Sequence, residues 1–281
     1  MYLHQLVQVQ KLVVIIKKMT GNIQNIIVIE SLGKQDGINF TGEALFNDFI
    51  KNRILVYGRE IYHSFYRVKN KSEFLAILKS YIGNAPYMPG GIIIHLEMHG
   101  SEDLKGLVLS DGSLVEWEEL VDLFREINII SCDNLFITMG TCYGRFLYKG
   151  VNPRKKSPYS GYISASVEVI AEEVYTKFGK LFEELIANGD IVDAYLEMEK
   201  TESNFYYKDS ERTFTETMEI TMQQLSNDKN LREQILSESI NQIKDEIGAE
   251  ISKEEADVLM KIAFKSIYDE HKQAFDFSDC K

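Results

Sequence analysis

The residues His99 and Cys142 could together carry out nucleophilic chemistry. Each ends an apolar stretch of the chain, and each is followed within two residues by a glycine, Gly100 and Gly144 respectively. A free thiol is only about a few per cent thiolate at neutral pH, and an adjacent imidazole can accept its proton and later return it. If the two stretches are neighbours in a sheet, the pair is predicted to act as a cysteine nucleophile with its base.

Backbone N–H groups beside this pair form the predicted oxyanion hole. Glycines at 100, 140 and 144 let the backbone approach a substrate carbonyl closely, as such a site requires. The candidate donors are the N–H groups of Gly100 and Cys142. A structural alternative stays open at this point, because free cysteine is often simply buried and a histidine that ends a strand is often only hydrogen-bonded.

The elements that would position the pair are strands alternating with helices. Short stretches rich in Ile and Val predict buried strands, and amphipathic patterns between them predict helices. The helix predicted at 72–81 begins with a cap at Ser72. This alternation predicts an α/β fold, a three-layer α/β/α sandwich with a mostly parallel sheet. Reactive groups in such sheets gather beyond the carboxyl ends of the strands. The predicted strands are 23–29, 61–68, 91–98, 135–139 and 162–167, and the predicted helices are 43–51, 72–81, 116–127 and 169–187.

Two segments depart from this alternation. Residues 106–117 are two short apolar runs around Asp111-Gly112, which predicts a β-hairpin leading into a helix. The chain is predicted to divide into a core at 1–204 and a mainly helical C-terminal extension at 205–281, packed on the core. Within the extension, helices are predicted at 231–247 and 252–268, while 212–222 fits either a strand or a helix.

The composition narrows the expected partners. A net charge of -12 argues against direct nucleic-acid binding, which depends on lysine and arginine neutralising phosphate. Every apolar run is far shorter than the roughly 20 residues that span a bilayer, and the run at 12–16 lacks the cleavage site of a signal peptide. We therefore expect a cytoplasmic protein that does not enter a membrane. Three cysteines without CxxC spacing argue against a disulfide framework or a cysteine-rich zinc site.

The two motifs together resemble those of the caspase-like (clan CD) cysteine peptidases. One apolar strand ends in His99-Gly100 and a second ends in Thr141-Cys142-Tyr143-Gly144, with the histidine and cysteine 43 residues apart and a hairpin between them. The segments 162–167 and 178–190 are similar to the corresponding region of bacterial caspase-like and CHAT-domain peptidases. The resemblance spans about residues 23–200. It implies that Cys142 is the nucleophile and His99 the general acid and base.

The predicted substrate pocket departs from the family pattern. Two positions before the nucleophile, caspases commonly carry Gln and metacaspases carry the Asp that recognises a basic P1 residue, whereas this chain has Gly140. The resemblance also implies that Ser164 and Ser166 line the pocket, and these small polar residues specify no charge. The pocket is therefore assigned to Gly140, Ser164 and Ser166, with the P1 preference open.

A metal site at His95, Glu97 and His99 is an alternative use of the first motif. The three residues face one side of a strand, but the ends of the set would lie about 13 Å apart, too far for both histidines to hold one zinc ion. We expect His95 and Glu97 to be packing or supporting groups. No metal and no organic cofactor is expected for the chemistry.

The predicted function is a cysteine endopeptidase that cleaves a protein substrate through the His99–Cys142 dyad. The resemblance further suggests a regulated or latent enzyme in a bacterial defence or signalling system, with an activating or inhibitory protein partner. The basic loop at 145–158 stands where caspase-like enzymes often keep a processing loop, and a solvated loop is the alternative. The alternative function is a catalytically silent fold that serves as a protein-interaction module. The natural substrate, the activating signal and the oligomeric state stay open.

Overall fold

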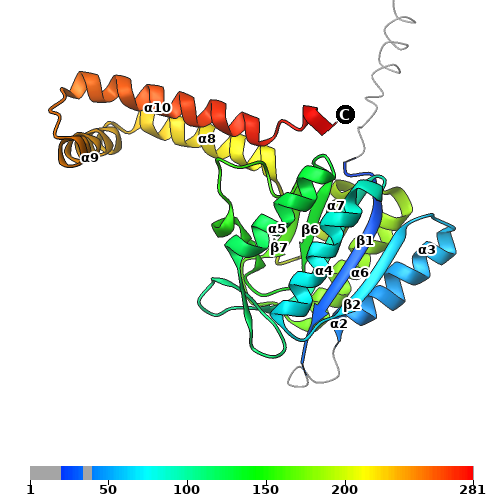
Figure 1. Cartoon of the computed structure of the whole chain (residues 1–281). Helices are drawn as coiled ribbons and strands as arrows, with labels where there is room; N and C mark the ends of the chain where they lie inside the picture. The colour runs from blue at the N-terminus through cyan, green and yellow to red at the C-terminus, as the bar shows by residue number, and fades with distance from the viewer. Residues whose placement is uncertain (1–19, 34–39, 281) are drawn as a thin grey trace, which may run out of the picture.

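The computed structural model describes residues 20–33 and 40–280, so the apolar run predicted at 12–16 lies outside the described residues. Its centre is a sheet in the strand order β2-β1-β3-β6-β7-β8 (Figure 1). Neighbouring strands are parallel from β2 to β7, and β8 joins antiparallel to β7. The strands are β1 (Ile23–Ser31), β2 (Tyr62–Arg67), β3 (Gly91–Gly100), β6 (Leu135–Met139), β7 (Gly161–Ala165) and β8 (Phe205–Asp209).

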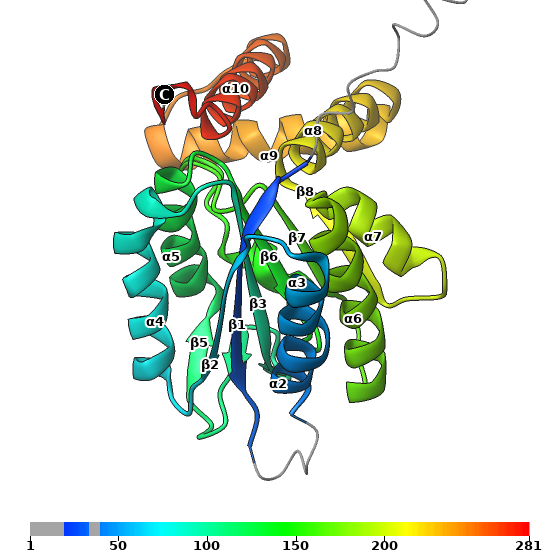
Figure 2. The same cartoon turned by 90° about the vertical axis from the view of Figure 1, so that its right-hand side faces the viewer.

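Helices cover both faces of this sheet, as Figure 2 shows. One face carries α4 (Lys71–Asn84) and α5 (Trp117–Ile130). The other face carries the continuous helical segment α2 (Thr41–Ala44), η2 (Leu45–Lys51) and α3 (Asn52–Tyr57), together with α6 (Ala171–Asn188) and α7 (Ile191–Glu199). The predicted α/β class, with a mostly parallel sheet between two helical layers, is confirmed.

Strand β3 divides its side chains between these two layers. Successive residues of a strand point to opposite faces, so Ile92, Ile94, Leu96 and Met98 pack toward α4 and α5. The alternate residues face α6, where the ring of His95 lies 4.6 Å from the ring of Phe178 and 5.2 Å from that of Phe182. On the α6 face of β3, the buried polar residues His95 and Glu97 thus stand where apolar residues would be expected.

The hairpin predicted from Asp111-Gly112 is present as β4 (Gly106–Val108) and β5 (Leu114–Glu116), with β4 paired to the end of β3. Gly112 has a φ of 85°, a conformation that glycine adopts readily. The predicted serine cap of α4 is wrong. Asn70 caps this helix, because its side-chain oxygen accepts from the Glu73 N–H at 2.9 Å.

The C-terminal segment begins as part of the sheet and continues as helices. Residues 205–209 form β8, with Asp209 opposite Gly161 at the start of β7. The helices α8 (Ser210–Asn227), α9 (Lys229–Ile247) and α10 (Lys253–Ala274) then form an arm that projects from the core (Figure 1). The segment 212–222, which fitted either a strand or a helix, is therefore helical. No described helix is long and apolar enough to cross a membrane.

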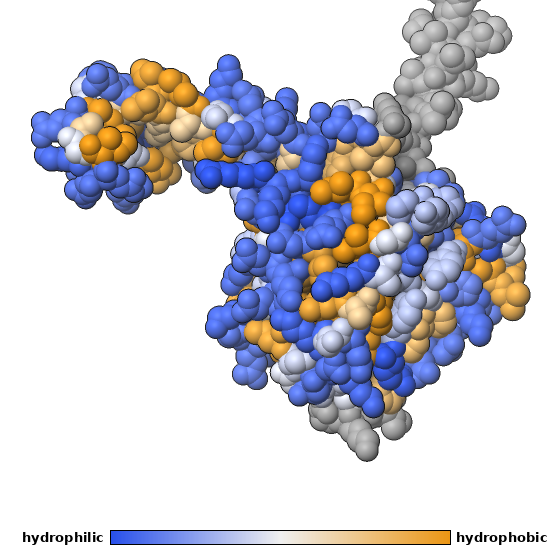
Figure 3. All heavy atoms as spheres, in the orientation of Figure 1, coloured by the Kyte–Doolittle hydropathy of each residue, from blue (hydrophilic) through white to orange (hydrophobic). Residues whose placement is uncertain are grey.

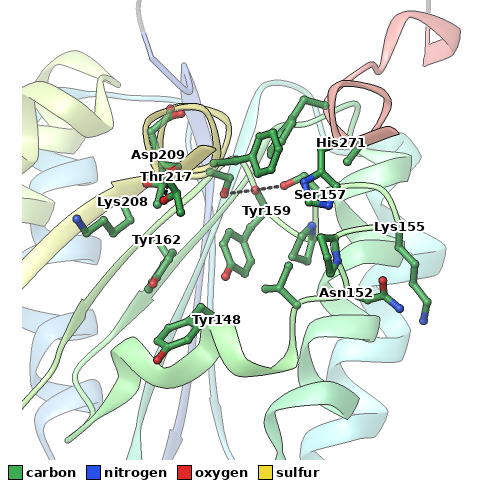
Figure 4. Close-up of a pocket in the computed structure, with 18 residues that line it drawn as sticks. Tyr148, Asn152, Lys155, Ser157, Tyr159, Tyr162, Lys208, Asp209, Thr217 and His271 are labelled. Atoms are coloured by element: carbon green, nitrogen blue, oxygen red, sulfur yellow. Dashed lines mark hydrogen bonds between the residues drawn. The ribbon is translucent and has the colours of Figure 1, made fainter. Parts of the chain in front are cut away.

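The arm is attached at the edge of the sheet where β7 begins, the edge opposite the carboxyl ends of the parallel strands. The Ser210 hydroxyl donates to the Tyr159 carbonyl at 2.7 Å, and the Ser157 N–H donates to the Ala274 carbonyl at 2.8 Å. A cavity of about 310 Å³ lies at this junction, with His271 on its arm side (Figure 4).

Candidate active site

The structure brings His99 and Cys142 into one cavity. Because β3 and β6 are adjacent and parallel, their carboxyl ends meet at the same edge of the sheet. His99 is the penultimate residue of β3 and is exposed, whereas Cys142 follows β6 by three residues and is half-buried. Both side chains line a cavity of about 190 Å³ on the α6 side of the sheet. The two residues therefore face the same space, as a thiol and an imidazole that act together must.

The two residues predicted to supply the oxyanion donors meet at the Cys142 carbonyl. A Cβ built on Gly100 would be 2.0 Å from the carbonyl oxygen of Cys142, so the two backbones are in contact. Within the described part of the chain, the Cys142 N–H donates no hydrogen bond to a protein acceptor. That N–H group is therefore available to a substrate oxygen.

A left-handed turn presents the thiol. Tyr143, the residue after Cys142, has φ 58° and ψ 16°, a conformation that is uncommon for a residue with a large side chain. The Tyr143 N–H donates to the Val167 carbonyl at 3.2 Å, and the Gly144 N–H donates to the Thr141 carbonyl at 3.3 Å. These bonds hold a sharp turn of the kind that often accompanies functional sites.

The thiol itself lies against the segment that leads into α6. The Val169 N–H donates to Cys142 Sγ at 3.4 Å, and Sγ lies 3.7 Å from the Val169 carbonyl oxygen. Helix α6 begins two residues later, at Ala171, which also lines the cavity. A helix N-terminus carries partial positive charge, and the carboxylates of Glu172 and Glu173 in the first turn of α6 offset it.

A buried hydrogen-bonded network supports the cavity from behind. His95 Nε2 lies 2.7 Å from Glu97 Oε1, and His95 Nδ1 lies 2.8 Å from Thr138 Oγ1. The Thr41 hydroxyl donates to Glu97 Oε2 at 2.7 Å. His95 is buried among the phenylalanines of α6 and supports Glu97, whereas Glu97 also forms part of the cavity wall. Glu97 is therefore both a supporting group and a residue of the candidate site.

The three residues predicted to line the substrate pocket have different positions. Gly140 lines the cavity, and a Cβ there would lie 2.3 Å from Glu97 Oε1, so the glycine leaves room for the carboxylate. Ser164 is buried in β7, and its hydroxyl has no hydrogen-bond partner among the described residues. Ser166 is half-buried just beyond β7. Neither serine lines the cavity that holds His99 and Cys142.

Several cavity residues were not identified from the sequence. Most of them come from elements distant in the chain, and their residue types carry no chemical signal. Glu97 could have been placed at the cavity from the sequence, because it lies two residues before His99 on a strand and its side chain must point to the same face of the sheet. The additional lining residues are Leu32, Thr41, Met98, Val169, Ala171 and Val174.

The other two cysteines lie away from this cavity, beside one another. The Cys132 thiol donates to the Cys280 carbonyl at 3.3 Å, and the Cys280 thiol donates to the Ile129 carbonyl at 3.4 Å. Burial, with the neighbouring Cys280 thiol, raises the pKa of Cys132 to about 11. Cys132 is therefore protonated at neutral pH, which disfavours a nucleophilic role.

The basic loop after Cys142 links the candidate site to the arm. Its first part folds as η4 (Gly144–Gly150), which packs against α5. Further along, the Lys155 ammonium lies 3.2 Å from the Asp122 carboxylate, and the Ser157 N–H donates a hydrogen bond to the Ala274 carbonyl of α10. The segment is therefore in contact with both the core and the arm, while residues 152–155 are exposed.

Comparisons with known proteins found little sequence similarity. Neither a scan against protein-family models nor a search of curated proteins gave a match. Among the solved structures that match is the crystal structure of the Drosophila initiator caspase Dronc, at 11% sequence identity and a TM-score of 0.44. The alignment covers 69% of this chain and 82% of the caspase chain. The fold described above rests on the strand order and helices of this chain itself.

Proposed function

We propose that the protein is a cysteine endopeptidase with a Cys142–His99 dyad. The observation that carries the proposal is the shared cavity of about 190 Å³, into which adjacent parallel strands bring the two side chains. The available Cys142 N–H and the neighbouring Gly100 backbone support an oxyanion hole at the same place. A thiol, an imidazole and backbone donors are the groups that acyl transfer requires.

The proposed reaction has two steps. His99 accepts the thiol proton, and Cys142 Sγ attacks the scissile carbonyl carbon to form a tetrahedral oxyanion held by backbone N–H groups. The C–N bond breaks, and the imidazolium protonates the leaving amine, which leaves a thioester on Cys142. Water then adds to the thioester as His99 takes its proton, and the C–S bond breaks to release the carboxylic acid and the thiol.

We further propose a cytoplasmic enzyme that acts on protein substrates under the control of a partner protein, in a bacterial defence or signalling setting. Exposed apolar residues on the arm support a partner surface there, and Figure 3 shows hydrophobic residues near its outer end. The loop from η4 to Ser157 offers a physical connection from the arm to the cysteine turn. Deleting residues 228–281 is expected to change regulation while leaving the dyad intact.

The test of the peptidase proposal is labelling of the full-length chain with an iodoacetamide-type probe, alongside cleavage of a fluorogenic peptide library. Wild type, Cys142→Ala and His99→Ala are compared by intact mass, with Cys280→Ala as the control for loss of a thiol outside the cavity. We expect labelling at Cys142 that slows in His99→Ala, and peptide cleavage that is lost in both site variants and kept in Cys280→Ala.

Other outcomes separate the alternatives. Cleavage that survives in Cys142→Ala would contradict the dyad. A Cys142 that reacts no faster in wild type than in His99→Ala, with no cleavage of any peptide, would favour the catalytically silent interaction module. Intact mass after incubation also tests processing of the loop at 145–158, since a fully active and uncleaved chain contradicts it.

A further inference from the structure

An ionisable carboxylate forms part of the wall of the cavity beside Cys142. Glu97 is only 1% exposed, and its two oxygens each have one hydrogen-bond partner, His95 Nε2 and the Thr41 hydroxyl, both at 2.7 Å. An ionised carboxylate can accept about four hydrogen bonds, so Glu97 keeps the capacity to accept from a ligand. Among the described residues, no lysine or arginine forms an ion pair with the Glu97 carboxylate.

Gly140 lies between this carboxylate and the cavity, and it carries no side chain. A Cβ at position 140 would lie 2.3 Å from Glu97 Oε1 and 2.7 Å from Val174 Cγ1, so any side chain there would displace the carboxylate or cover it. Gly140 precedes Cys142 by two residues, and a chain of that length spans at most about 7 Å. The carboxylate is therefore within reach of a long side chain whose own carbonyl is at the thiol.

Apolar residues form much of the remaining wall of the cavity, beside Thr41 and His99. Leu32, Met98, Val169, Ala171 and Val174 contribute to it, and no lysine or arginine of residues 20–33 and 40–280 lines it. Its volume of about 190 Å³ is below the roughly 300 Å³ at which pockets for whole small molecules begin, which fits a site for one side chain. An apolar channel with a carboxylate matches the methylene stem and cationic end of lysine or arginine.

The neighbouring surface carries the same charge. A second cavity of about 420 Å³ shares Thr41 and Ala171 with the first, and it adds the carboxylates of Asp48 and Glu172. Within the part of the chain that the structure describes, no lysine or arginine lines this second cavity either. A recess lined by one sign of charge raises the local concentration of oppositely charged substrates.

We infer that this cavity is the P1 pocket and that the Glu97 carboxylate selects a lysine or arginine side chain. The inference rests on the proposed peptidase function and names its substrate class. Glu97 acts as a specificity-determining residue, because it contacts the P1 side chain and takes no part in the bond changes at Cys142. Gly140 permits that contact by carrying no side chain.

The test uses peptidyl acyloxymethyl ketones that differ only at P1, where they carry lysine, norleucine or aspartate. Norleucine keeps the stem of lysine without its charge. The rate of Cys142 alkylation in the full-length chain is followed by intact mass. We expect lysine to react about 10- to 100-fold faster than norleucine, and aspartate to react slowest.

Two variants examine the role of the pocket, and one serves as a control. Glu97→Gln keeps the shape of the side chain and is expected to bring the lysine-to-norleucine ratio close to one. Gly140→Ala should have the same effect by displacing the carboxylate, and it serves as the test if Glu97→Gln fails to fold. Glu168→Gln removes an exposed carboxylate near the site, hydrogen-bonded by Tyr143 at 3.4 Å, and should leave the ratio unchanged.

Iodoacetamide, which places no side chain in the pocket, distinguishes failure of the inference from failure of the proposed function. His99-dependent alkylation by iodoacetamide together with equal rates for lysine and norleucine overturns the basic P1 pocket and leaves the peptidase standing. A preference for aspartate, or a lysine preference that persists in Glu97→Gln and Gly140→Ala, also overturns the basic P1 pocket and leaves the peptidase standing. A Cys142 that reacts with none of the probes in folded protein overturns both.

Discussion

The carbonyl oxygen of Cys142 lies 2.0 Å from the point that a Cβ on residue 100 would occupy, so Gly100 and Cys142 meet backbone to backbone. Heavy atoms that share no bond cannot be that close. The glycine that follows His99 is therefore what allows the end of β3 to lie against the cysteine turn.

Replacing Gly100 with alanine should consequently separate the two halves of the candidate site. We expect Gly100→Ala to lower the free energy of unfolding by about 1–3 kcal/mol and to slow Cys142 labelling, since the added methyl group meets backbone that cannot rotate away. Chemical denaturation and probe labelling measure the two effects. Gly83→Ala is the control, because a Cβ at Gly83 in α4 has no atom within 4 Å, and it should stabilise the fold by about 0.5–1 kcal/mol. Equal stability changes in both variants would contradict the close contact.

The buried bond between Thr138 and His95 should contribute measurably to stability. Thr138→Val leaves His95 Nδ1 buried without a partner, and we expect it to lower the free energy of unfolding by about 1–3 kcal/mol. Urea denaturation followed by circular dichroism gives the value. Ser164→Ala is the matched control, since this hydroxyl is equally buried but has no partner among the described residues, and its removal should be neutral or stabilising. A Thr138→Val variant as stable as wild type would show that the bond is not formed.

The reactivity of Cys132 should depend on pH in a defined way. Because burial, with the neighbouring Cys280 thiol, raises the pKa of Cys132 to about 11, its thiolate is scarce at pH 7.5 and increases about tenfold per pH unit toward that value. We expect iodoacetamide to modify Cys132 in the folded chain very slowly at pH 7.5 and progressively faster up to pH 10. Peptide mapping measures the rate at each pH, and labelling in urea provides the unfolded reference. Rapid modification of folded Cys132 at pH 7.5 would refute the assignment.

Packing of α10 on α8, at the base of the arm, should weaken in acid. Burial lowers the pKa of His271 below its ordinary value of 6.5, although the nearby Glu270 acts in the opposite direction. The folded state therefore favours the neutral ring, and its contribution to stability is present above pH 6.5 and is lost as the pH falls through the lowered pKa. The His271 ring packs 4.3 Å from the ring of Phe214, at the cavity shown in Figure 4.

His271→Phe keeps an aromatic ring and removes this titration. The difference in free energy of unfolding, wild type minus His271→Phe, is expected to be smaller at pH 5 than at pH 7.5, as measured by urea denaturation. Limited proteolysis between Ser210 and α10 at the two pH values reports on the arm directly. A difference that stays constant with pH would mean that His271 does not titrate in this range.

The sequence by itself predicted the parallel strands and the helices around them and pointed to the two candidate residues, but it did not predict β8. Alternating apolar stretches predicted the α/β class, and the ends of the segments at 91–98 and 135–139 identified His99 and Cys142, because strand ends and chemically reactive residue types are local properties. Local sequence patterns predicted the ends of the helices less reliably. The cap of α4 falls on Asn70, because the capping bond depends on where the backbone first turns.

Only the tertiary structure decided which residues share the cavity. Thr41, Glu97 and Val169 come from α2, β3 and the segment before α6, and only packing of those elements brings them to Cys142. Ser164 and Ser166 do not line the cavity that holds His99 and Cys142, whereas Gly140 lines it next to the Glu97 carboxylate. A pocket is defined by distances between segments far apart in the chain, and a pattern of neighbouring residues contains no such distances. The sequence therefore identified the candidate residues, and the packing of β3, β6 and α6 decided which other residues lie beside them.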